Sequence, residues 1–228
     1  MKSNIPFLLF VLFTVFSLKA QEFEMVKNIN PFGASSSPFS ITEYNGKLYF
    51  SGKNGSNGEE LWVSHGTLLG TQMLKDINPS GDSYPGGFTL YNGNMYFVAN
   101  DNLHGYELWV TDGTASGTQL FKDIHPTGDS SPNYFTVCND KLYFAAYDPV
   151  HGRELWVTDG TALGTQMIKD IQPTPLFDSN PSLLTFYNGK VYFEAYDGVH
   201  GRELWVTDGT ESGTQMLKDI YPGINNSV

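Results

Sequence analysis

The stretch Glu107-Leu108-Trp109-Val110-Thr111-Asp112-Gly113-Thr114 decides the architecture of this chain, because it recurs along the sequence. Nearly the same residues surround each tryptophan, at intervals of 47, 47 and 49 residues. A period in the forties that repeats in this way is typical of a modular array of similar units. We therefore expect one repeat domain over residues 21–228. The tryptophans that mark its units are Trp62, Trp109, Trp156 and Trp205.

Each unit contains four short strand-like segments and no sustained helical periodicity. In the second unit these segments are residues 88–91, 95–100, 107–111 and 118–124. Asn92-Gly93 separates the first two segments, and Asn-Gly is a strong hairpin signal because both turn residues need positive φ. The third connection is an Asp-Gly-Thr turn, and a longer loop leads to the next unit. Three hairpins followed by a longer loop predict one four-stranded antiparallel sheet per unit.

The strand pairing in the third hairpin follows from the sequence. Placing the two threonines that flank the turn opposite each other sets Trp109 opposite Leu120. The same register sets Glu107 opposite Lys122. Both faces of the sheet are then apolar, and such a sheet needs a neighbour on each side. We therefore predict an all-β, β-propeller-like array, in which each blade packs against its neighbours and buries its tryptophan.

Residues 107–114, 154–161 and 203–210 closely resemble the ELWxxDGT repeat family, and the resemblance covers essentially all of residues 22–228. It implies a secreted bacterial protein with propeller-like blades and implies no enzymatic activity. The first unit departs from the motif, with His65 where the other units have Asp. Residues 24–29 resemble a fourth strand, so we expect four full repeats plus one orphan N-terminal strand. This count favours a fragment of a larger ring, and a closed four-bladed ring and an open arc are the alternatives.

Residues 1–20 have the pattern of a secretory signal peptide. Lys2 precedes an apolar run over residues 7–18, and Ala20 is a small residue at the expected cleavage point. The run is shorter than the about 20 residues that span a bilayer, and a retained anchor is the alternative interpretation. We expect a secreted or cell-surface protein without a transmembrane anchor after cleavage.

The composition argues against several classes of protein. A chain of 228 residues with 40% hydrophobic and 14% aromatic residues can form a packed core, so it is not a disordered protein. A net charge of −11 argues against nucleic-acid binding, because it repels phosphate. The single cysteine, Cys138, cannot form an intramolecular disulfide. It replaces a tyrosine of the other units, so we expect a buried core thiol.

The Asp-Gly-Thr turns are the polar motif that recurs most often. Their aspartates can accept hydrogen bonds from turn amides, and their glycines permit positive φ. These properties predict a structural role in each turn. The residues concerned are Asp112, Gly113, Asp159, Gly160, Asp208 and Gly209.

The loops between the second and third strands form the candidate binding surface. Strand parity puts them on the same side as the inter-unit loops, and we call this side the loop face. The candidate ligand-binding residues on it are His104, Asp148, His151, Arg153, Asp197, His200 and Arg202. In the alternative interpretation, each Asp and His only stabilises its own hairpin. Calcium binding by Asp82, Asp129 or Asp178 is conceivable, although the chain has no Asp-x-Asp-x-Asp-Gly loop; no other cofactor is expected.

These observations predict a secreted, non-catalytic scaffold that binds an extracellular glycan or protein through the loop face. We also expect Arg153 and Arg202 to lie on exposed loops, where replacing both leaves the fold intact. A polysaccharide hydrolase or lyase is one alternative, since Glu43 and Glu194 break the repeat pattern. Hydrolases need two carboxylates about 5–10 Å apart, and these two acids come from unrelated positions. A purely structural surface spacer is the other alternative.

Overall fold

The computed structural model describes residues 24–31, 33–174, 177–220 and 222–223. These residues form sixteen strands and no helix. The strands make four antiparallel sheets, each built from four consecutive strands, which confirms the predicted all-β array. The predicted signal peptide, residues 1–20, lies outside the described residues. Within the described residues, no helix is long and apolar enough to cross a membrane.

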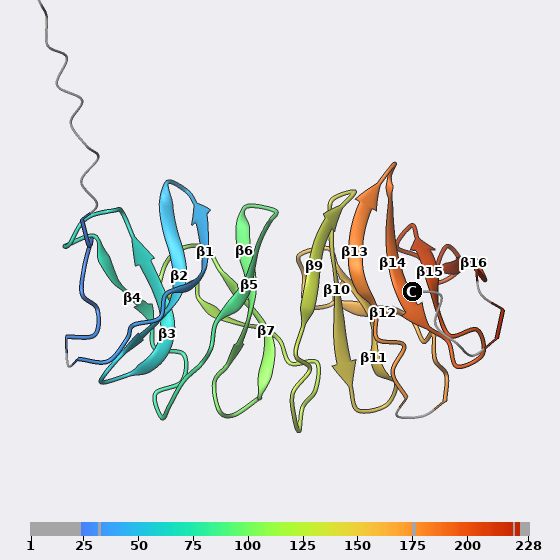
Figure 1. The fold of residues 1–228 in the computed structure, drawn as a ribbon, viewed down its shortest axis with the longest axis horizontal. Coiled ribbons are helices and arrows are strands. Elements are labelled where there is room, and N and C mark those ends of the chain that lie inside the picture. The colour runs from blue at the N-terminus through green and yellow to red at the C-terminus, as the bar shows by residue number, and fades with distance from the viewer. Residues whose placement is uncertain (1–23, 32, 175–176, 221, 224–228) are drawn as a thin grey trace, which may run out of the picture.

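The four sheets, called blades here, stand side by side in chain order (Figure 1). Blade 1 consists of β1 (Phe39–Tyr44), β2 (Lys47–Asn54), β3 (Gly58–Ser64) and β4 (Thr71–Lys75). Blade 2 consists of β5 (Gly86–Tyr91), β6 (Asn94–Asn100), β7 (Tyr106–Thr111) and β8 (Gln119–Lys122). Blade 3 consists of β9 (Asn133–Cys138), β10 (Lys141–Asp148), β11 (Gly152–Thr158) and β12 (Gln166–Lys169). Blade 4 consists of β13 (Ser182–Tyr187), β14 (Lys190–Tyr196), β15 (Arg202–Thr207) and β16 (Gln215–Lys218).

The first hairpin of each blade turns as the sequence predicts. Asn92 and Gly93 connect β5 to β6 with φ values of 48° and 75°. In blade 3 the variant pair Asn139 and Asp140 adopts the same left-handed conformation, with φ values of 47° and 53°. Positive φ at both positions gives the turn the twist of the flanking strands. The strands predicted for blade 2 agree with the observed strands to within two residues at each end.

The register of the third hairpin is confirmed at the tryptophan and is wrong beyond it. Trp109 lies opposite Leu120, as predicted, and the other three tryptophans lie opposite methionines. The register then shifts by one residue, so that Leu108, not Glu107, lies opposite Lys122. The same irregularity lies between the leucine and the tryptophan of the Leu-Trp pair in every blade. It turns the Glu107 carboxylate away from the predicted lysine, toward the inter-blade loop.

The tryptophans occupy the interfaces between blades. Trp109 belongs to blade 2, and it packs in one cluster with Leu61 and Ile77 of blade 1. Two further clusters join blade 2 to blade 3 and blade 3 to blade 4. All four indole side chains are buried, with 5–9% of their surface exposed, as predicted. The first strands β1, β5, β9 and β13 contact one another in sequence, so the blades are arranged radially around these inner strands.

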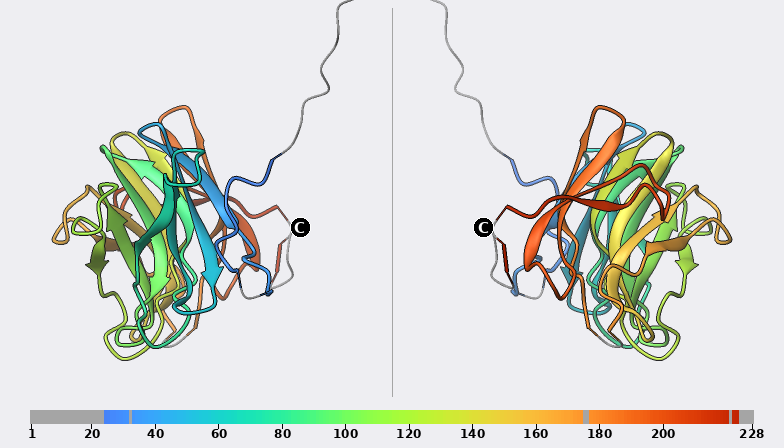
Figure 2. Two further views of the ribbon diagram at one scale, coloured as in Figure 1. Left: turned by 90° about the vertical axis from the view of Figure 1, so that its left-hand side faces the viewer. Right: turned by 90° about the vertical axis from the view of Figure 1, so that its right-hand side faces the viewer.

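The array is an open arc rather than a closed ring. Figures 1 and 2 show blade 1 and blade 4 at opposite ends of the row. Among the described residues, no core cluster joins blade 4 to blade 1. Residues 24–30 cover part of the face of blade 1 that points away from blade 2, and there Ile29 packs against Phe50 and Trp62. Ile29 thus takes the place that Ile77 takes beside blade 2, although residues 24–30 pair with no strand.

Candidate binding surface

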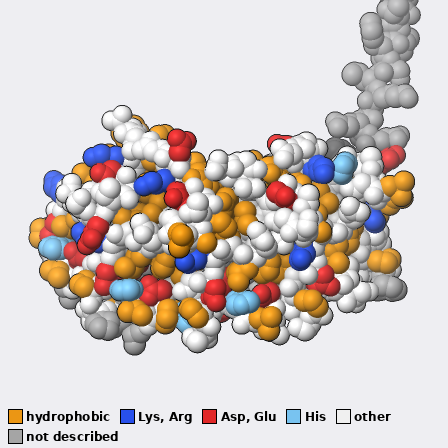
Figure 3. Space-filling view, turned by 180° about the vertical axis from the view of Figure 1, so that it is seen from behind, with side chains coloured by type: hydrophobic (Ala, Val, Ile, Leu, Met, Phe, Trp, Pro, Cys, Tyr) orange, Lys and Arg blue, Asp and Glu red, His pale blue; other side chains and the backbone are white. Residues whose placement is uncertain are grey.

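The loop face carries three similar hairpin loops, over residues 101–105, 149–151 and 197–201. They connect the second strand to the third in blades 2, 3 and 4. Figure 3 shows histidine side chains spaced along one edge of the molecule, with acidic side chains beside them. Blade 1 departs from this pattern, because its loop holds Asn54 and Asn57, which bond each other at 3.2 Å.

In each of these three hairpins an aspartate side chain lies within hydrogen-bond distance of the histidine three residues later in the chain. The His Nδ1 atom lies 2.7 Å from Asp101 in blade 2, 3.0 Å from Asp148 in blade 3 and 2.7 Å from Asp197 in blade 4. The same carboxylates accept hydrogen bonds from two backbone amides of the loop. Each Asp–His pair is therefore completed within its own hairpin. The three histidines are His104, His151 and His200.

In blades 2 and 4 the pairing shifts the pKa of both partners. The hydrogen bond to the Asp101 carboxylate raises the pKa of His104, and the equivalent bond to Asp197 raises the pKa of His200. Burial alone would raise the pKa of Asp101, but the hydrogen bonds from His104 and the loop amides outweigh burial and lower it. Since each ring is fixed through Nδ1 and its side chain is more than a third exposed, the opposite edge of the imidazole faces solvent.

An exposed aliphatic side chain precedes each of these histidines. Sequence reasoning did not single out these residues, although their position beside the recurring histidine was a visible signal. Between 62% and 83% of their surface is exposed, which is high for apolar residues. We call the three residues the aliphatic tips; they are Leu103, Val150 and Val199.

The two arginines do not lie on exposed loops, and that prediction is corrected. Arg153 is partly buried, and its Nη1 donates to the carbonyl of Ser131 at 3.0 Å. Arg202 donates to the carbonyl of Asn180 at 3.3 Å and forms an ion pair with Glu194 at 3.1 Å. Both guanidinium groups thus hold the loop that enters their own blade. The expectation that replacing both arginines leaves the fold intact stays a prediction, and these contacts lead us to expect some loss of stability.

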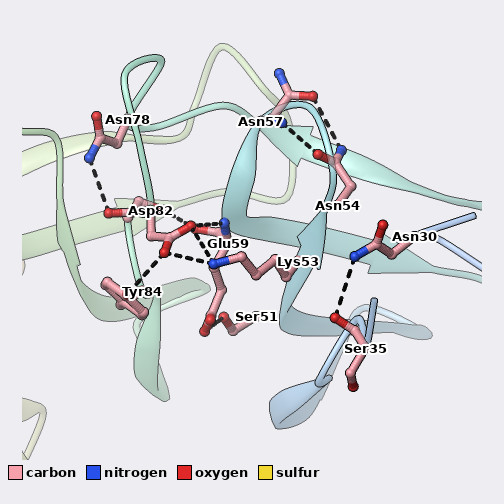
Figure 4. Close-up of polar contacts among 11 residues, drawn as sticks. Asn30, Ser35, Ser51, Lys53, Asn54, Asn57, Glu59, Asn78, Asp82 and Tyr84 are labelled. Atoms are coloured by element: carbon pink, nitrogen blue, oxygen red, sulfur yellow. Dashed lines mark hydrogen bonds and ion pairs between the residues drawn. The ribbon is translucent and has the colours of Figure 1, made fainter. Parts of the chain in front are cut away.

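The aspartates considered for calcium hold the inter-blade loops in place. Asp82, Asp129 and Asp178 each accept a hydrogen bond of 2.8–2.9 Å from the backbone amide of a residue in the third strand of a blade. Figure 4 shows Asp82 also in contact with Lys53 and Tyr84. Within the described residues, no three His, Cys, Asp or Glu side chains gather in a group that could hold a metal ion.

The sequence analysis missed a buried hydrogen-bond network built on the Glu of each Glu-Leu-Trp motif. Glu107 is fully buried and accepts hydrogen bonds from Ile124 N at 2.8 Å and from Ser130 N at 2.9 Å. The Ser130 hydroxyl also bonds this carboxylate. Glu60 pairs with Ser83 and Glu154 with Ser179 in the same way. The signal was available, because each of these serines stands two residues before a proline in every inter-blade loop.

Burial controls the protonation of these glutamates. It raises the pKa of Glu60 and of Glu154 to about 7, more than the donated hydrogen bonds lower it. It also raises the pKa of Glu107. These carboxyl groups hold the inter-blade loop against the third strand. They are closed off from solvent, so they form no site for a ligand.

The Asp-Gly-Thr turns are held by their own side chains. The Asp112 carboxylate accepts hydrogen bonds from Thr114 N at 2.8 Å and Thr114 Oγ1 at 2.7 Å, and these bonds lower the pKa of Asp112. Asp159 and Asp208 bond Thr161 and Thr210 in the same way. Each central glycine has φ near 90°; these are Gly113, Gly160 and Gly209.

The structure does not bring the two pattern-breaking acids together. Glu43 lies in β1 of blade 1 and accepts a hydrogen bond from Gly46 N at 2.7 Å. Glu194 lies in β14 of blade 4 and bonds Ser182 as well as Arg202. Each carboxylate is therefore occupied locally, in blades at opposite ends of the arc. Cys138 is buried, and burial raises the pKa of its thiol.

No family model and no curated protein matches the chain. Among solved structures, the computationally designed Ika8 protein has a TM-score of 0.47 at 17% identity, with 87% of this chain and 53% of that chain covered. The designed Ika4 protein has a TM-score of 0.42 at 15% identity, with coverages of 81% and 98%. An α-L-arabinofuranosidase (CtGH43) from Clostridium thermocellum has a TM-score of 0.38 at 16% identity, with coverages of 81% and 73%. This chain spans about half the length of the Ika8 chain, and the similarities concern the fold alone.

Proposed function

We propose that this protein is a secreted, non-catalytic scaffold of the ELWxxDGT repeat type, which binds an extended extracellular glycan or protein through its loop face. One observation carries the proposal. Blades 2, 3 and 4 present the same exposed pair, an aliphatic tip followed by a histidine with a fixed ring. The pair recurs at the same place in successive blades, as a surface for a repetitive ligand requires.

The chemistry of the pair suits recognition better than catalysis. Each aliphatic tip offers an apolar contact, and each imidazole edge offers a hydrogen bond beside it. Individual contacts of this kind are weak, but three of them along one ligand raise the overall affinity through effective concentration. The proposal therefore expects a ligand that spans several blades rather than a small molecule in one pocket.

Replacing all three aliphatic tips tests the proposal without disturbing the Asp–His bonds. The variant Leu103→Ser, Val150→Ser, Val199→Ser is compared with wild type on a glycan array and against extracellular protein extracts. We expect binding to fall by about 10-fold or more, since three contacts are lost together. The control is Leu69→Ser with Leu163→Ser, which removes exposed leucines from the turns of the opposite face. Equal loss of binding in both variants would contradict the proposal.

A purely structural spacer is the second candidate, because every Asp–His pair is completed within its own hairpin. A spacer should bind nothing in either screen, while its melting temperature should still drop when the histidines are replaced. Binding by wild type that depends on the aliphatic tips would rule the spacer out.

A further inference from the structure

The outer face of blade 4 exposes residues that the other blades bury. Leu61, Leu108 and Leu155 are completely buried by the next blade, whereas 38% of the equivalent Leu204 is exposed. Likewise Ile220 is 57% exposed, although its three equivalents are buried in the blade interfaces. A hollow of about 410 Å³ lies between these two side chains and Leu183. Blade 4 therefore has the surface of an inter-blade interface without the neighbouring blade.

Blade 1 offers the matching surface at the other end of the arc. Phe50 and Trp62 stand where Phe97 and Trp109 stand in blade 2, on the face that receives the preceding blade. Leu48 is 42% exposed, and its equivalents in the other blades are completely buried. The internal interfaces of this chain already demonstrate that such a face packs against the kind of face that blade 4 exposes.

Residues 24–30 lie against blade 1 where the fourth strand of a preceding blade would lie. Lys27 Nζ donates to the carbonyl of Thr71 at 2.7 Å, as Lys169 of β12 donates to the carbonyl of Thr214 in blade 4 at 2.9 Å. The sequence Met25-Val26-Lys27-Asn28-Ile29 also matches Met216-Leu217-Lys218-Asp219-Ile220, which contains most of β16. The N-terminal segment therefore has the fit of a fourth strand but no third strand to pair with.

We propose that two copies of this chain associate head to tail, with blade 4 of each copy packed on blade 1 of the other. The N-terminal segment of each copy replaces β16 as the fourth strand of the partner copy's blade 4, because both cannot occupy that position. β16 is the strand that gives way, since it has only four residues and is largely exposed.

We expect two copies, rather than three or more, to complete a closed ring of blades. Two arcs of four blades give eight blades, the upper end of the usual range for propellers, and three arcs exceed it. A head-to-tail contact that does not close would instead give open filaments. Glu194 and Arg202 line this hollow as well, and they already form an ion pair within blade 4 at 3.1 Å, so neither depends on the partner copy for an opposite charge.

Sedimentation velocity tests the association by measuring the mass of residues 21–228 in solution over a range of protein concentrations. We expect a single species of twice the chain mass. Leu204→Arg should reduce the mass to that of one copy with an unchanged circular dichroism spectrum. The control Leu163→Arg, which replaces a turn residue that is 96% exposed, should stay at twice the mass. A single copy at every concentration, or a ladder of larger species, overturns the closed pair.

A cross-link tests the strand exchange separately. Val206 lies opposite Gln215 of β16, and Glu24 is the N-terminal equivalent of Gln215. In the variant Glu24→Cys, Val206→Cys, the exchange brings the two cysteines of different copies together. Oxidation should then yield disulfide-linked dimers on a non-reducing gel. A sample that has twice the chain mass but forms no such cross-link contradicts the exchange.

Discussion

Replacing Trp109 with alanine removes the largest side chain from the interface between blades 1 and 2. The indole contacts Leu61 and Ile77 of blade 1 and Phe97 of its own blade, and only 6% of its surface is exposed. Leu61 and Phe97 belong to strands, and Ile77, in the segment after β4, is itself buried with 5% of its surface exposed, so we expect little movement into the space. The substitution therefore leaves a cavity between two sheets.

The expected loss of stability follows from the buried area. A tryptophan buries roughly 150–250 Å², which at about 25 cal/mol per Å² is worth about 4–6 kcal/mol. The unfolded chain already buries part of this area, which lowers the figure by about 10–40%. We therefore expect Trp109→Ala to lower the free energy of unfolding by about 3–5 kcal/mol, as for other large-to-small core changes.

Urea unfolding at one fixed protein concentration, followed by far-UV circular dichroism, measures this loss. Because the blades contact only their neighbours, a weakened interface should also let blade 1 unfold in a separate, earlier step. The control Leu163→Ala changes a side chain that is almost fully exposed and should shift the free energy by less than about 0.5 kcal/mol. A loss below about 1 kcal/mol for Trp109→Ala would refute the burial of the indole between blades.

The remaining predictions concern the polar and backbone contacts. Burial raises the pKa of Glu60 and Glu154 to about 7, above the 4.5 of an unfolded glutamate, so the stability due to their neutral forms is complete below pH 4.5 and is lost as pH rises through 7. The urea midpoint should fall between about pH 5 and pH 8, and Glu154→Gln should flatten this slope; an unchanged slope contradicts the assignment. Gly113→Ala should cost about 2–3 kcal/mol, because φ is +90° and a Cβ would meet a tyrosine hydroxyl of blade 1 at 2.6 Å. Gly66→Ala, at φ +75° with nothing within 4 Å, should cost about 1 kcal/mol, and equal losses in thermal melts would contradict the close contact. Arg153→Met should lower stability by about 1–2 kcal/mol through its two lost carbonyl bonds, whereas an unchanged melting temperature would put the arginine back on an exposed loop.

Local sequence signals were sufficient for the strands and the hairpins. The Asn-Gly pairs between the first two strands of blades 1, 2 and 4 needed positive φ at both residues, and they have it in the structure. The pairing of Trp109 with Leu120 followed from a turn of fixed length. The next predicted pair, Glu107 with Lys122, is wrong. The register shifts at Leu108, and the Glu107 carboxylate accepts hydrogen bonds from amides of the inter-blade loop instead. Those amides lie 17 or more residues away in the chain, so a pairing rule based on alternation could not include them.

The sequence by itself determined the repeat, the four-stranded blade and the burial of the tryptophans, because a sheet that is apolar on both faces must be covered on both. Only the tertiary structure decided that Arg153 and Arg202 hold inter-blade loops, since both reach backbone carbonyls of residues about 22 positions earlier. It also decided that the four blades form an open arc. The angle between neighbouring blades depends on how their side chains interlock, and this angle accumulates over three interfaces, so no single repeat of the sequence encodes whether the ends meet.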